Sequence, residues 1–330
     1  MIDDDQIEQI EEQYAPRERG KKIQFKRGRS HKQVIAQIAD VAKNTPTGWS
    51  GIAYPTPPLG MIEQASDARA GFNPSFHASR HERKWIITYL GPFYEDSLIT
   101  DVLHPVKGGK EANVYCCAAH PTIGAQWLAA KVYRPGIFRK LKNDALYREG
   151  GVLKEDGRVI RNRRAQVAMK KKTDFGKEIL HANWLENEYG ILRALHSAGA
   201  DVPQPFASGE NAMLIEYIGE EGAPAPPLNR VRLERAEAKN LFERLMHNVQ
   251  VMLAHDCVHG DLSGFNVLYW EGDIWIIDFP QAVNPFKNPH AFKLLTRDLE
   301  RLCDHFARYG IRAEARALAR ELWKKSNLPE

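Results

Sequence analysis

The chain has 330 residues, of which 43% are hydrophobic, and a formal net charge of +4. This length allows a substantial core and about two domains, and such a mild charge by itself says little about nucleic acid. Residues 1–12 are acidic, and no apolar run approaches the roughly 20 residues of a membrane helix, which argues against secretion and membrane insertion. The four cysteines show no C-x-x-C spacing and favour a reducing compartment, so we expect a cytoplasmic protein with no membrane partner.

The first 83 residues indicate an extension that is partly disordered. Lys or Arg fills eight of the sixteen positions in residues 17–32, a block that could neutralise phosphates of RNA or DNA. A solvated tail is the plainer interpretation of the same block. Ser30 could cap a short amphipathic helix, and the prolines and glycines of residues 44–60 indicate a linker. We therefore expect an extension over residues 1–83 and a main domain over residues 84–330.

Residues 106–115 predict a strand, a turn and a second strand. Gly108, Gly109 and Ala112 keep the turn small enough for its backbone amides to approach a phosphate, although most glycine pairs simply form a hairpin turn. Lys131 follows the apolar residues 127–130 and is expected on the next strand, where it could reach the α- and β-phosphates of a nucleotide. This lysine favours a phosphate-binding loop over an ordinary turn.

A buried lysine needs a carboxylate partner, because an isolated ammonium group is costly to remove from water. The helical pattern of residues 183–195 offers Glu186 and Glu188, beside an apolar side that includes Leu185 and Leu192. We choose Glu188 as the partner of Lys131. Either glutamate could instead be a surface residue paired at i, i+4 spacing.

Further segments complete the expected arrangement. Residues 138–177 form a basic insertion, which suits a phosphate clamp or a mobile surface loop. Residues 213–218 predict a strand leading into a connection whose backbone at Glu216 and Ile218 could hydrogen-bond an adenine base. Amphipathic helices are expected over residues 233–256 and 312–325, the second of them structural.

Residues 258–281 place polar side chains at both ends of a predicted hairpin. The turn H-G-D-L-S-G-F-N carries Asp261 and Asn266, and Asp278 ends the second apolar run. Because a hairpin returns the chain to its start, we expect these side chains to converge. An Asn oxygen and an Asp carboxylate can hold Mg²⁺ on a triphosphate, while a second Asp orients the attacking group. Residues that merely cap turns are the alternative, which explains one or two of them but hardly the whole set.

The spacing H-x-D-x-x-x-x-N, followed by an apolar strand and Asp, resembles the catalytic and metal-binding loops of the protein-kinase fold. More specifically, the chain resembles the RIO family of atypical protein kinases, nearest its first subfamily. It looks like a bacterial relative of that family. The resemblance spans residues 98–308. It is carried by residues 109–115, 130–133, 184–188, 202–205, 218–219, 224–226, 259–263, 276–278 and 288–291, with Asn266, Gln281, Arg297 and Asp298.

The resemblance implies an α+β, two-lobed protein-kinase-like fold with a compact RIO-type core, its N-lobe over about residues 84–215 and its C-lobe over about residues 219–330. It implies an ATP- and Mg²⁺-dependent serine/threonine protein kinase or ATPase. Asp261 would be the catalytic aspartate, with Lys131 on the phosphates and Asn266 and Asp278 as metal ligands. The residues expected to bind the nucleotide are Gly108, Gly109, Lys110, Glu111, Ala112, Asn113, Val114, Lys131, Glu188, Glu216, Ile218 and Asn266.

The chain departs from ordinary protein kinases in ways that bear on its partners. Those enzymes place Phe-Gly after the metal Asp, a long activation segment after that, and Lys two residues beyond the catalytic Asp. Here Phe279 and Pro280 follow Asp278, and Ser263 occupies the lysine position. Proteins of the RIO family are similar in lacking these parts, and some are ATPase switches that form a phospho-aspartate. The resemblance therefore implies a protein substrate or self-phosphorylation, with RNA or a ribosomal subunit as a further candidate partner.

Two other function classes remain open at this point. The aminoglycoside and choline kinase families share the same metal and base residues, so a small-molecule phosphotransferase fits almost as well. However, the roughly 50 residues after Asp278 mix arginines with acids, which argues against a cationic small substrate. A nucleotide-gated RNA-binding module with little turnover is the third interpretation, because intact catalytic residues show only that turnover is possible.

Overall fold

The computed structural model describes residues 71–109, 112–133, 154–155, 158–159 and 174–328. The basic block, the helix expected after Ser30, the linker and most of the basic insertion lie outside these residues, as do Lys110 and Glu111. No helix in the described ranges combines the length and hydropathy that crossing a membrane requires.

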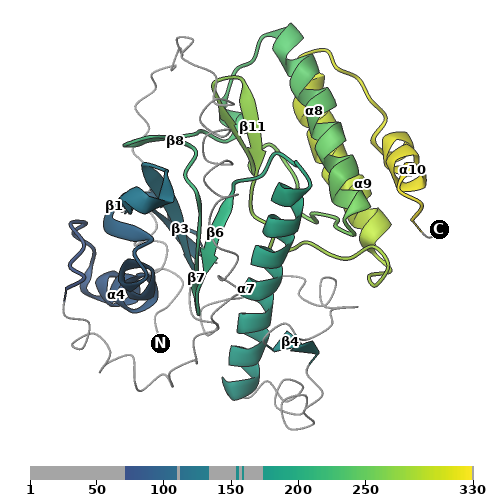
Figure 1. Ribbon diagram of the computed structural model, residues 1–330. Coiled ribbons are helices and arrows are strands. Elements are labelled where there is room, and N and C mark those ends of the chain that lie inside the picture. Colours follow the sequence, from purple (N-terminus) through teal and green to yellow (C-terminus); the bar gives the residue numbers. More distant parts are fainter. Residues whose placement is uncertain (1–70, 110–111, 134–153, 156–157, 160–173, 329–330) are drawn as a thin grey trace, which may run out of the picture.

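An antiparallel five-stranded sheet forms the N-terminal half of the described chain (Figure 1). Its strand order is β1-β2-β3-β7-β6. The strands are β1 (Ile99–Lys107), β2 (Ala112–Ala119), β3 (Trp127–Tyr133), β7 (Ala212–Glu216) and β6 (Pro205–Ser208), and the short helix η2 (Pro121–Ile123) joins β2 to β3. The two strands predicted on either side of Gly108 and Gly109 are thereby confirmed, with β3 as the expected next strand, whereas the predicted turn includes Lys110 and Glu111, outside the described residues.

Helix α4 (Arg80–Glu95) covers one face of this sheet. Its Ile86 and Leu90 share a buried cluster with Leu128, Ala130 and other sheet residues of the same parity. Because side chains alternate across a strand, the intervening Ala129, Lys131 and Tyr133 must point to the opposite face. The alternation of β3 therefore aims Lys131 away from α4.

Helix α7 (Asp174–Ser197) lies on the side of the sheet to which Lys131 points. Leu185 packs there with Tyr133 and Met213, whereas Leu192 and Leu195 belong to the buried core of the C-terminal helices. The sequence pattern placed this helix over residues 183–195 and extended the insertion to residue 177, so the helix begins earlier than expected.

The C-terminal half is mainly helical. Helices α8 (Arg235–Ala254), α9 (Ala291–Ala307) and α10 (Ala315–Lys325) pack around one core with the hairpin β10 (Val267–Trp270) and β11 (Asp273–Ile276). The hairpin turn at Glu271 and Gly272 has positive φ at both residues, as two-residue hairpins favour. The expected helices over residues 233–256 and 312–325 are confirmed with slightly shorter bounds.

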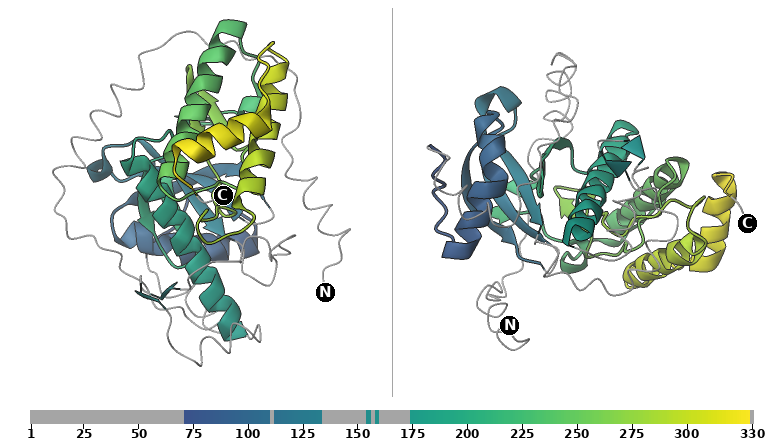
Figure 2. Two further views of the ribbon diagram at one scale, coloured as in Figure 1. Left: turned by 90° about the vertical axis from the view of Figure 1, so that its right-hand side faces the viewer. Right: turned by 90° about the horizontal axis from the view of Figure 1, so that it is seen from below.

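The two halves form separate lobes with α7 between them (Figure 2, right). A short connection joins them through β8 (Gly219–Glu220), β9 (Ala223–Pro224) and η4 (Leu228–Arg230). A further two-stranded piece consists of β4 (Lys154–Glu155) and β5 (Arg158–Val159). The predicted α+β, two-lobed architecture is therefore confirmed.

The packed region of the N-terminal lobe begins before residue 84, where we expected the domain to start. Phe72 is buried in the same cluster as α4 and the sheet, and Ser79 caps α4 by accepting a hydrogen bond from Glu82 N. Isolated aromatic residues among Gly, Asn and Ser give no periodic signal, so the sequence pattern indicated an irregular segment there.

Candidate active site

Lys131 lies where the two lobes meet. Its Nζ is 2.7 Å from Glu188 Oε1 and 2.7 Å from Asp278 Oδ1. Burial acts to lower the pKa of this amine, but the carboxylates of Asp278 and Glu188 outweigh it and hold the pKa above its ordinary value. Lys131 is therefore a fixed positive charge, held by a carboxylate from each lobe.

Glu188 is the buried partner that the helical pattern of α7 allows. It lies three residues after Leu185 and four before Leu192, on the apolar side of the helix, whereas Glu186 is exposed. Its second oxygen, Oε2, accepts a hydrogen bond of 2.7 Å from Tyr133 Oη. The sequence-based choice of Glu188 over Glu186 is thus matched by the geometry.

Asp278 and Asn266 are brought together by the hairpin. Ile277 N donates to Asn266 O at 2.9 Å, which places Asp278 beside the end of the polar turn. The backbone of Asp278 has φ of +74°, a left-handed conformation that is uncommon for a residue other than glycine. Burial acts to raise the pKa of its carboxyl group, but Lys131 outweighs that effect and holds the pKa below its ordinary value.

Asp261 completes the convergence that the sequence predicted. Asn266 Nδ2 donates to Asp261 O at 2.9 Å and lies 3.4 Å from its Oδ2. On the other side, Asp261 N donates to His259 Nδ1, while His259 Nε2 donates to Ile277 O. Burial lowers the pKa of His259, in agreement with a neutral ring that carries its proton on Nε2. His259 therefore has a structural role in shaping the turn.

Helix α9 contacts the same turn through hydrogen bonds and an ion pair. Gly260 N donates to Asp298 Oδ2 at 2.8 Å, and Arg297 donates through Nη2 to Gly260 O. Arg301, one helical turn further, places Nη1 2.6 Å from Asp261 Oδ1. Burial raises the pKa of Asp298 to about 7, against the opposing effect of Arg297. The helix thus contacts the backbone and the exposed carboxylate of the polar turn.

The backbone at Gly109 lies close to Ala112, as a residue without a side chain permits. A Cβ on Gly109 would lie 2.9 Å from Ala112 O, nearer than a side chain tolerates. Beyond the turn, Asn113 Nδ2 donates to Tyr115 Oη, which in turn donates to Glu82 on α4 at 2.8 Å. Ala112 is buried, whereas a Cβ on Gly108 would have no close contact, its nearest neighbour being Asn113 Oδ1 at 4.0 Å. Val114 lies on β2 opposite Lys131 of β3.

The connection between the lobes contains the two backbone positions proposed for base binding. Glu216 is the last residue of β7, and its N–H donates to Gln204 O at 2.8 Å. Ile218 is buried, and its carbonyl accepts from Ala225 N at 2.9 Å. These bonds fix the path of the connection next to Gly219, whose φ is +129°.

The donor set at Asn266 and Asp278 fits a magnesium ion that is shared with a phosphate ligand. Among the described residues, no group of three or more His, Cys, Asp or Glu side chains could hold a metal on its own. Asp278 has a side chain that is 35% exposed, and Asn266, whose Nδ2 is engaged, retains an amide oxygen as a ligand. Mg²⁺ commonly takes one or two such protein oxygens and completes its shell with water and substrate phosphates.

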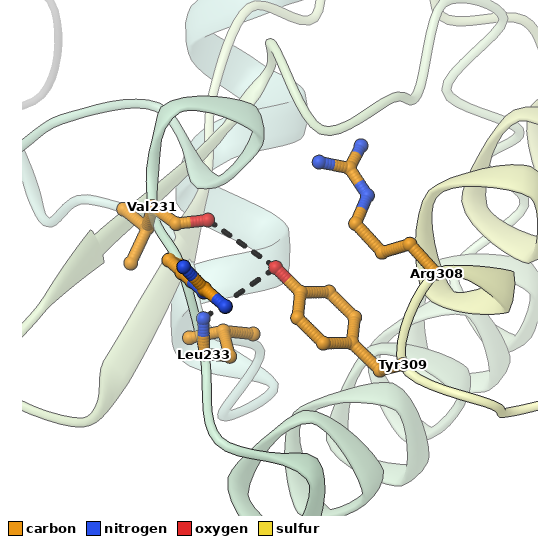
Figure 3. A pocket seen from close by; sticks show the side chains of 5 residues that line it. Val231, Leu233, Arg308 and Tyr309 are labelled. Atoms are coloured by element: carbon orange, nitrogen blue, oxygen red, sulfur yellow. Dashed lines mark hydrogen bonds between the residues drawn. The ribbon is translucent and has the colours of Figure 1, made fainter.

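A cavity of about 440 Å³ lies elsewhere on the C-terminal lobe (Figure 3). It is lined by Val231, Arg232, Leu233, Arg308 and Tyr309. Tyr309 Oη donates to Val231 O at 3.3 Å and accepts from Leu233 N at 3.4 Å, which closes one wall. The cavity shares no lining residue with the cluster around Lys131, so the concentration of charged groups, and not this cavity, marks the candidate site.

The sequence reasoning missed the contribution of α9 to the site. Asp298 interrupts the apolar stripe of that helix, between Leu294, Leu295 and Leu302, and a carboxylate in such a stripe signals a specific buried contact. Arg301 offered no comparable signal, because an arginine on a mixed-charge helix is usually a solvated side chain. Tyr133 was also missed, although its parity with Lys131 on β3 places it on the same face.

Solved structures of known proteins have the same fold. The sheet lobe, the helical lobe and the lysine between two carboxylates define a protein-kinase-like architecture. The Rio2 kinase from Chaetomium thermophilum, solved as an ADP/Mg²⁺-phosphoaspartate complex, superposes with a TM-score of 0.50 over 92% of this chain and 95% of that chain, at 16% identity. A second structure of that kinase also gives a TM-score of 0.50, over 86% of this chain and 84% of that chain, at 19% identity.

The family profile described as RIO domain matches residues 146–318, and the chain belongs to this family. The serine/threonine-protein kinase RIO1 of Caenorhabditis elegans is 31% identical over 62% of this chain. The RIO-type serine/threonine-protein kinase Rio1 of Thermoplasma acidophilum is 30% identical over 43% of this chain and 73% of its own length. The chain spans only 37% of the C. elegans protein and 34% of human RIO1.

Proposed function

We propose that this protein catalyses ATP- and Mg²⁺-dependent phosphoryl transfer, as a RIO-type serine/threonine protein kinase or ATPase. The observation that carries the proposal is the position of Lys131, within 2.7 Å of both Glu188 and Asp278, at the junction where Asp261 and Asn266 also meet. A charged lysine held between lobes can bind phosphate oxygens, and converging carboxylate and amide oxygens suit the accompanying metal.

Each residue of the site would have a distinct role in nucleotide binding or in phosphoryl transfer. Lys131 and the backbone amides of residues 108–114 would offset the charge of the phosphates, while Glu216 and Ile218 would hold the base through their backbone. Asn266 and Asp278 would hold Mg²⁺, which supplies charge neutralisation and alignment of the phosphates when bound. Asp261 would orient the acceptor and accept the proton of its hydroxyl group.

The transfer itself is balanced without a further reactant. The bond between the γ-phosphorus and the β–γ bridging oxygen of ATP breaks, and this oxygen leaves with ADP, as a bond forms between that phosphorus and the acceptor oxygen. If the acceptor is a serine or threonine hydroxyl, its proton passes to Asp261. If the acceptor is water, the same groups give ATP hydrolysis.

A second candidate is an ATPase switch in which a carboxylate oxygen of Asp278 accepts the phosphoryl group and water later releases it. Two observations favour it. The Rio2 kinase of similar fold was solved with a phosphoaspartate, and the Asp278 side chain here is partly exposed in a left-handed backbone conformation. In this case no acceptor proton is removed in the first step.

The nature of the acceptor and the partner is part of the proposal. A protein substrate or the protein itself would serve a kinase, whereas RNA or a ribosomal subunit would be the partner of a switch. The basic residues 17–32 supply charge suited to RNA phosphates. We place the activity in the domain over residues 84–330 and expect it in the cytoplasm.

The test uses the full chain with γ-³²P-ATP and Mg²⁺, with and without RNA or ribosomal subunits, followed by hydroxylamine, which cleaves acyl phosphates. Label that hydroxylamine removes, and that Asp278→Ala lacks, supports the switch. Stable label on Ser or Thr supports the protein kinase, and phosphate release without protein label supports simple ATP hydrolysis. If the protein neither binds nor consumes ATP with Mg²⁺, the proposal is wrong.

A further inference from the structure

The ion pair between Arg301 and Asp261 joins α9 to the exposed end of the polar turn. Arg301 Nη1 lies 2.6 Å from Asp261 Oδ1, and the two side chains are 40% and 37% exposed. Within the described residues, Arg301 makes no other hydrogen bond. A guanidinium group carries five N–H donors, so most of its hydrogen-bonding capacity remains available at this edge of the site.

The position of Arg301 is fixed by contacts made one helical turn earlier. Arg297 and Asp298 both bind the backbone of Gly260, the residue that immediately precedes Asp261. Residues four apart on a helix lie on the same face, so the helix that holds the turn also aims Arg301 at its carboxylate. The pair thus differs from a chance contact between two mobile surface chains.

The charge that develops during phosphoryl transfer favours a cation at this place. Phosphoryl transfer spreads negative charge over the equatorial oxygens of the moving group, and an arginine supplied in cis or in trans often balances it. Lys131 is already bound to two carboxylates, and the turn from Asp261 to Asn266 contains no basic residue. Ser263 stands where a lysine of the turn would otherwise contribute.

Because the Arg301–Asp261 ion pair is partly exposed, Arg301 can shift part of its hydrogen bonding from Asp261 to a ligand. Exposed ion pairs contribute little to folding stability, so moving part of the guanidinium from a carboxylate to a phosphate involves a small loss. Arginine can bind two oxygens at once with its planar fork, which suits a group shared by Asp261 and a phosphoryl oxygen.

We propose that Arg301 is a cis-acting catalytic arginine that binds the phosphoryl group during transfer while it keeps Asp261 oriented towards the acceptor. This inference rests on the proposed phosphoryl-transfer function. Arg301 exchanges no proton and no electron, and its role is to balance charge that develops at the oxygens of the transferred group.

The experiment compares wild-type protein with Arg301→Ala, Arg301→Lys and the control Arg320→Ala, which removes an exposed arginine of α10. Binding is measured for ADP with Mg²⁺ and for the transition-state mimic formed by ADP, Mg²⁺ and aluminium fluoride. We expect Arg301→Ala to bind ADP within about threefold of wild type but to lose about tenfold or more in affinity for the mimic. Turnover of γ-³²P-ATP should fall by at least the same factor, with partial recovery in Arg301→Lys.

Four results would overturn the inference. Turnover that is unchanged or faster in Arg301→Ala would mark the pair as neutral or inhibitory. An equal loss of affinity for ADP and for the mimic would indicate a general structural effect, and a similar change in Arg320→Ala would indicate net charge alone. If Arg301→Ala has a lowered Tm, Arg301→Lys provides the test instead. We expect Arg301→Lys to prefer the mimic over ADP less strongly than wild type does, and an unchanged preference would contradict the inference.

The outcomes also separate this inference from the proposed function. Wild-type turnover that Asp261→Asn abolishes, together with full activity in Arg301→Ala, would leave the proposed function intact and remove only the role of Arg301. Absence of nucleotide binding and turnover in the wild type would remove both.

Discussion

Lys131 Nζ lies 2.7 Å from Asp278 Oδ1, although 147 positions of the chain separate the two residues. The first belongs to the sheet lobe and the second follows the hairpin of the helical lobe. A nucleotide phosphate and a metal ion that enter here must compete with this contact, since the phosphate attracts Lys131 and the metal attracts Asp278. The pair therefore fixes both groups in place before any ligand arrives.

The role of Glu188 in holding this lysine can be tested by one substitution on α7. We expect Glu188→Gln to weaken ATP turnover by about tenfold or more, because a misplaced Lys131 aligns the phosphates poorly. Glu186→Gln is the matched control, since Glu186 lies on the same helix but is exposed. Steady-state kinetics with ATP provide the measurement. Equal effects in the two variants would contradict a specific Lys131–Glu188 pair.

Asp261→Asn should abolish turnover while leaving ATP binding nearly intact. The side chain is partly exposed and contacts Asn266 and Arg301, so the substitution removes a proton acceptor without opening a cavity. Removal of a general base typically lowers rates by about 10²–10⁴-fold. ATP binding and single-turnover rates measured on the same preparation would decide the question. Turnover at the wild-type rate would exclude Asp261 as the catalytic aspartate.

Asp298 should make folding stability fall as the pH rises towards neutrality. Its carboxyl pKa is about 7 in the folded protein and near 3.8 when unfolded, because the folded chain buries it. The folded state therefore binds the proton more tightly, and this stabilisation is complete below the lower pKa and is lost as the pH rises through about 7. Between the two pKa values, the free energy of unfolding should fall by as much as about 1.4 kcal/mol per pH unit.

The measurement for Asp298 is urea unfolding at several pH values, compared between wild type and Asp298→Asn. Neighbouring charged groups, including Arg297 and Arg301, are common to both proteins, so the difference between the two curves isolates this carboxyl group. Asp298→Asn should lack the extra slope between about pH 4 and pH 7. Parallel curves would show that Asp298 does not titrate in this range.

Glycine substitutions test the backbone of the connection between the lobes. Gly219 has φ of +129°, and a Cβ there would lie 2.5 Å from Ala223 O. We expect Gly219→Ala to destabilise the protein by about 1–3 kcal/mol. By contrast, Gly190→Ala on the exposed side of α7 meets no atom within 4 Å and should stabilise by about 0.5–1 kcal/mol. Thermal unfolding of both variants checks the opposite signs.

Arg244 should be more important to stability than the charged residues beside it on α8. Its guanidinium binds both oxygens of Asp201 at 2.6 and 2.7 Å and Asp273 at 2.5 Å, which ties the helix to the segment after α7 and to the hairpin. We expect Arg244→Met to cost about 1–3 kcal/mol, because it leaves two partly buried carboxylates without this partner. Lys239→Met, in an exposed pair, should change stability by less than about 0.5 kcal/mol. Denaturant midpoints would distinguish them.

The parts of the site that sequence predicted are those governed by local periodicity. Strand alternation places Lys131, helical spacing places Glu188, and hairpin return brings Asp278 to Asn266 and Asp261. The assigned catalytic and metal-binding roles of these residues stay predictions. Each rule acts over a few residues, which is why the meeting of these residues followed from the pattern, whereas the fold class followed from the family resemblance.

The contacts that sequence did not predict depend on tertiary placement. Nothing in the pattern of α9 says that Arg301 meets a carboxylate 40 positions earlier, or that Arg244 joins Asp201 to Asp273. Charged side chains on a helix are compatible with solvent as well as with a partner, so their pairing follows only from how the helices pack. The early start of the N-terminal packing at Phe72 was also not predicted, because isolated aromatic residues give no periodic signal.

Helix α7 has its final turns in the core of the helical lobe, through Leu192 and Leu195, while Lys131 belongs to the sheet. Glu188 lies between Leu192 and Leu185, which packs on the sheet with Tyr133, so this carboxylate stands where α7 passes from one lobe to the other. Asp278 follows the hairpin of the helical lobe, so a change in the angle between the lobes would move Asp278 relative to Lys131, whereas Glu188 also contacts the sheet through Tyr133. The Lys131–Asp278 ion pair is thus a direct side-chain link between the sheet lobe and the helical lobe.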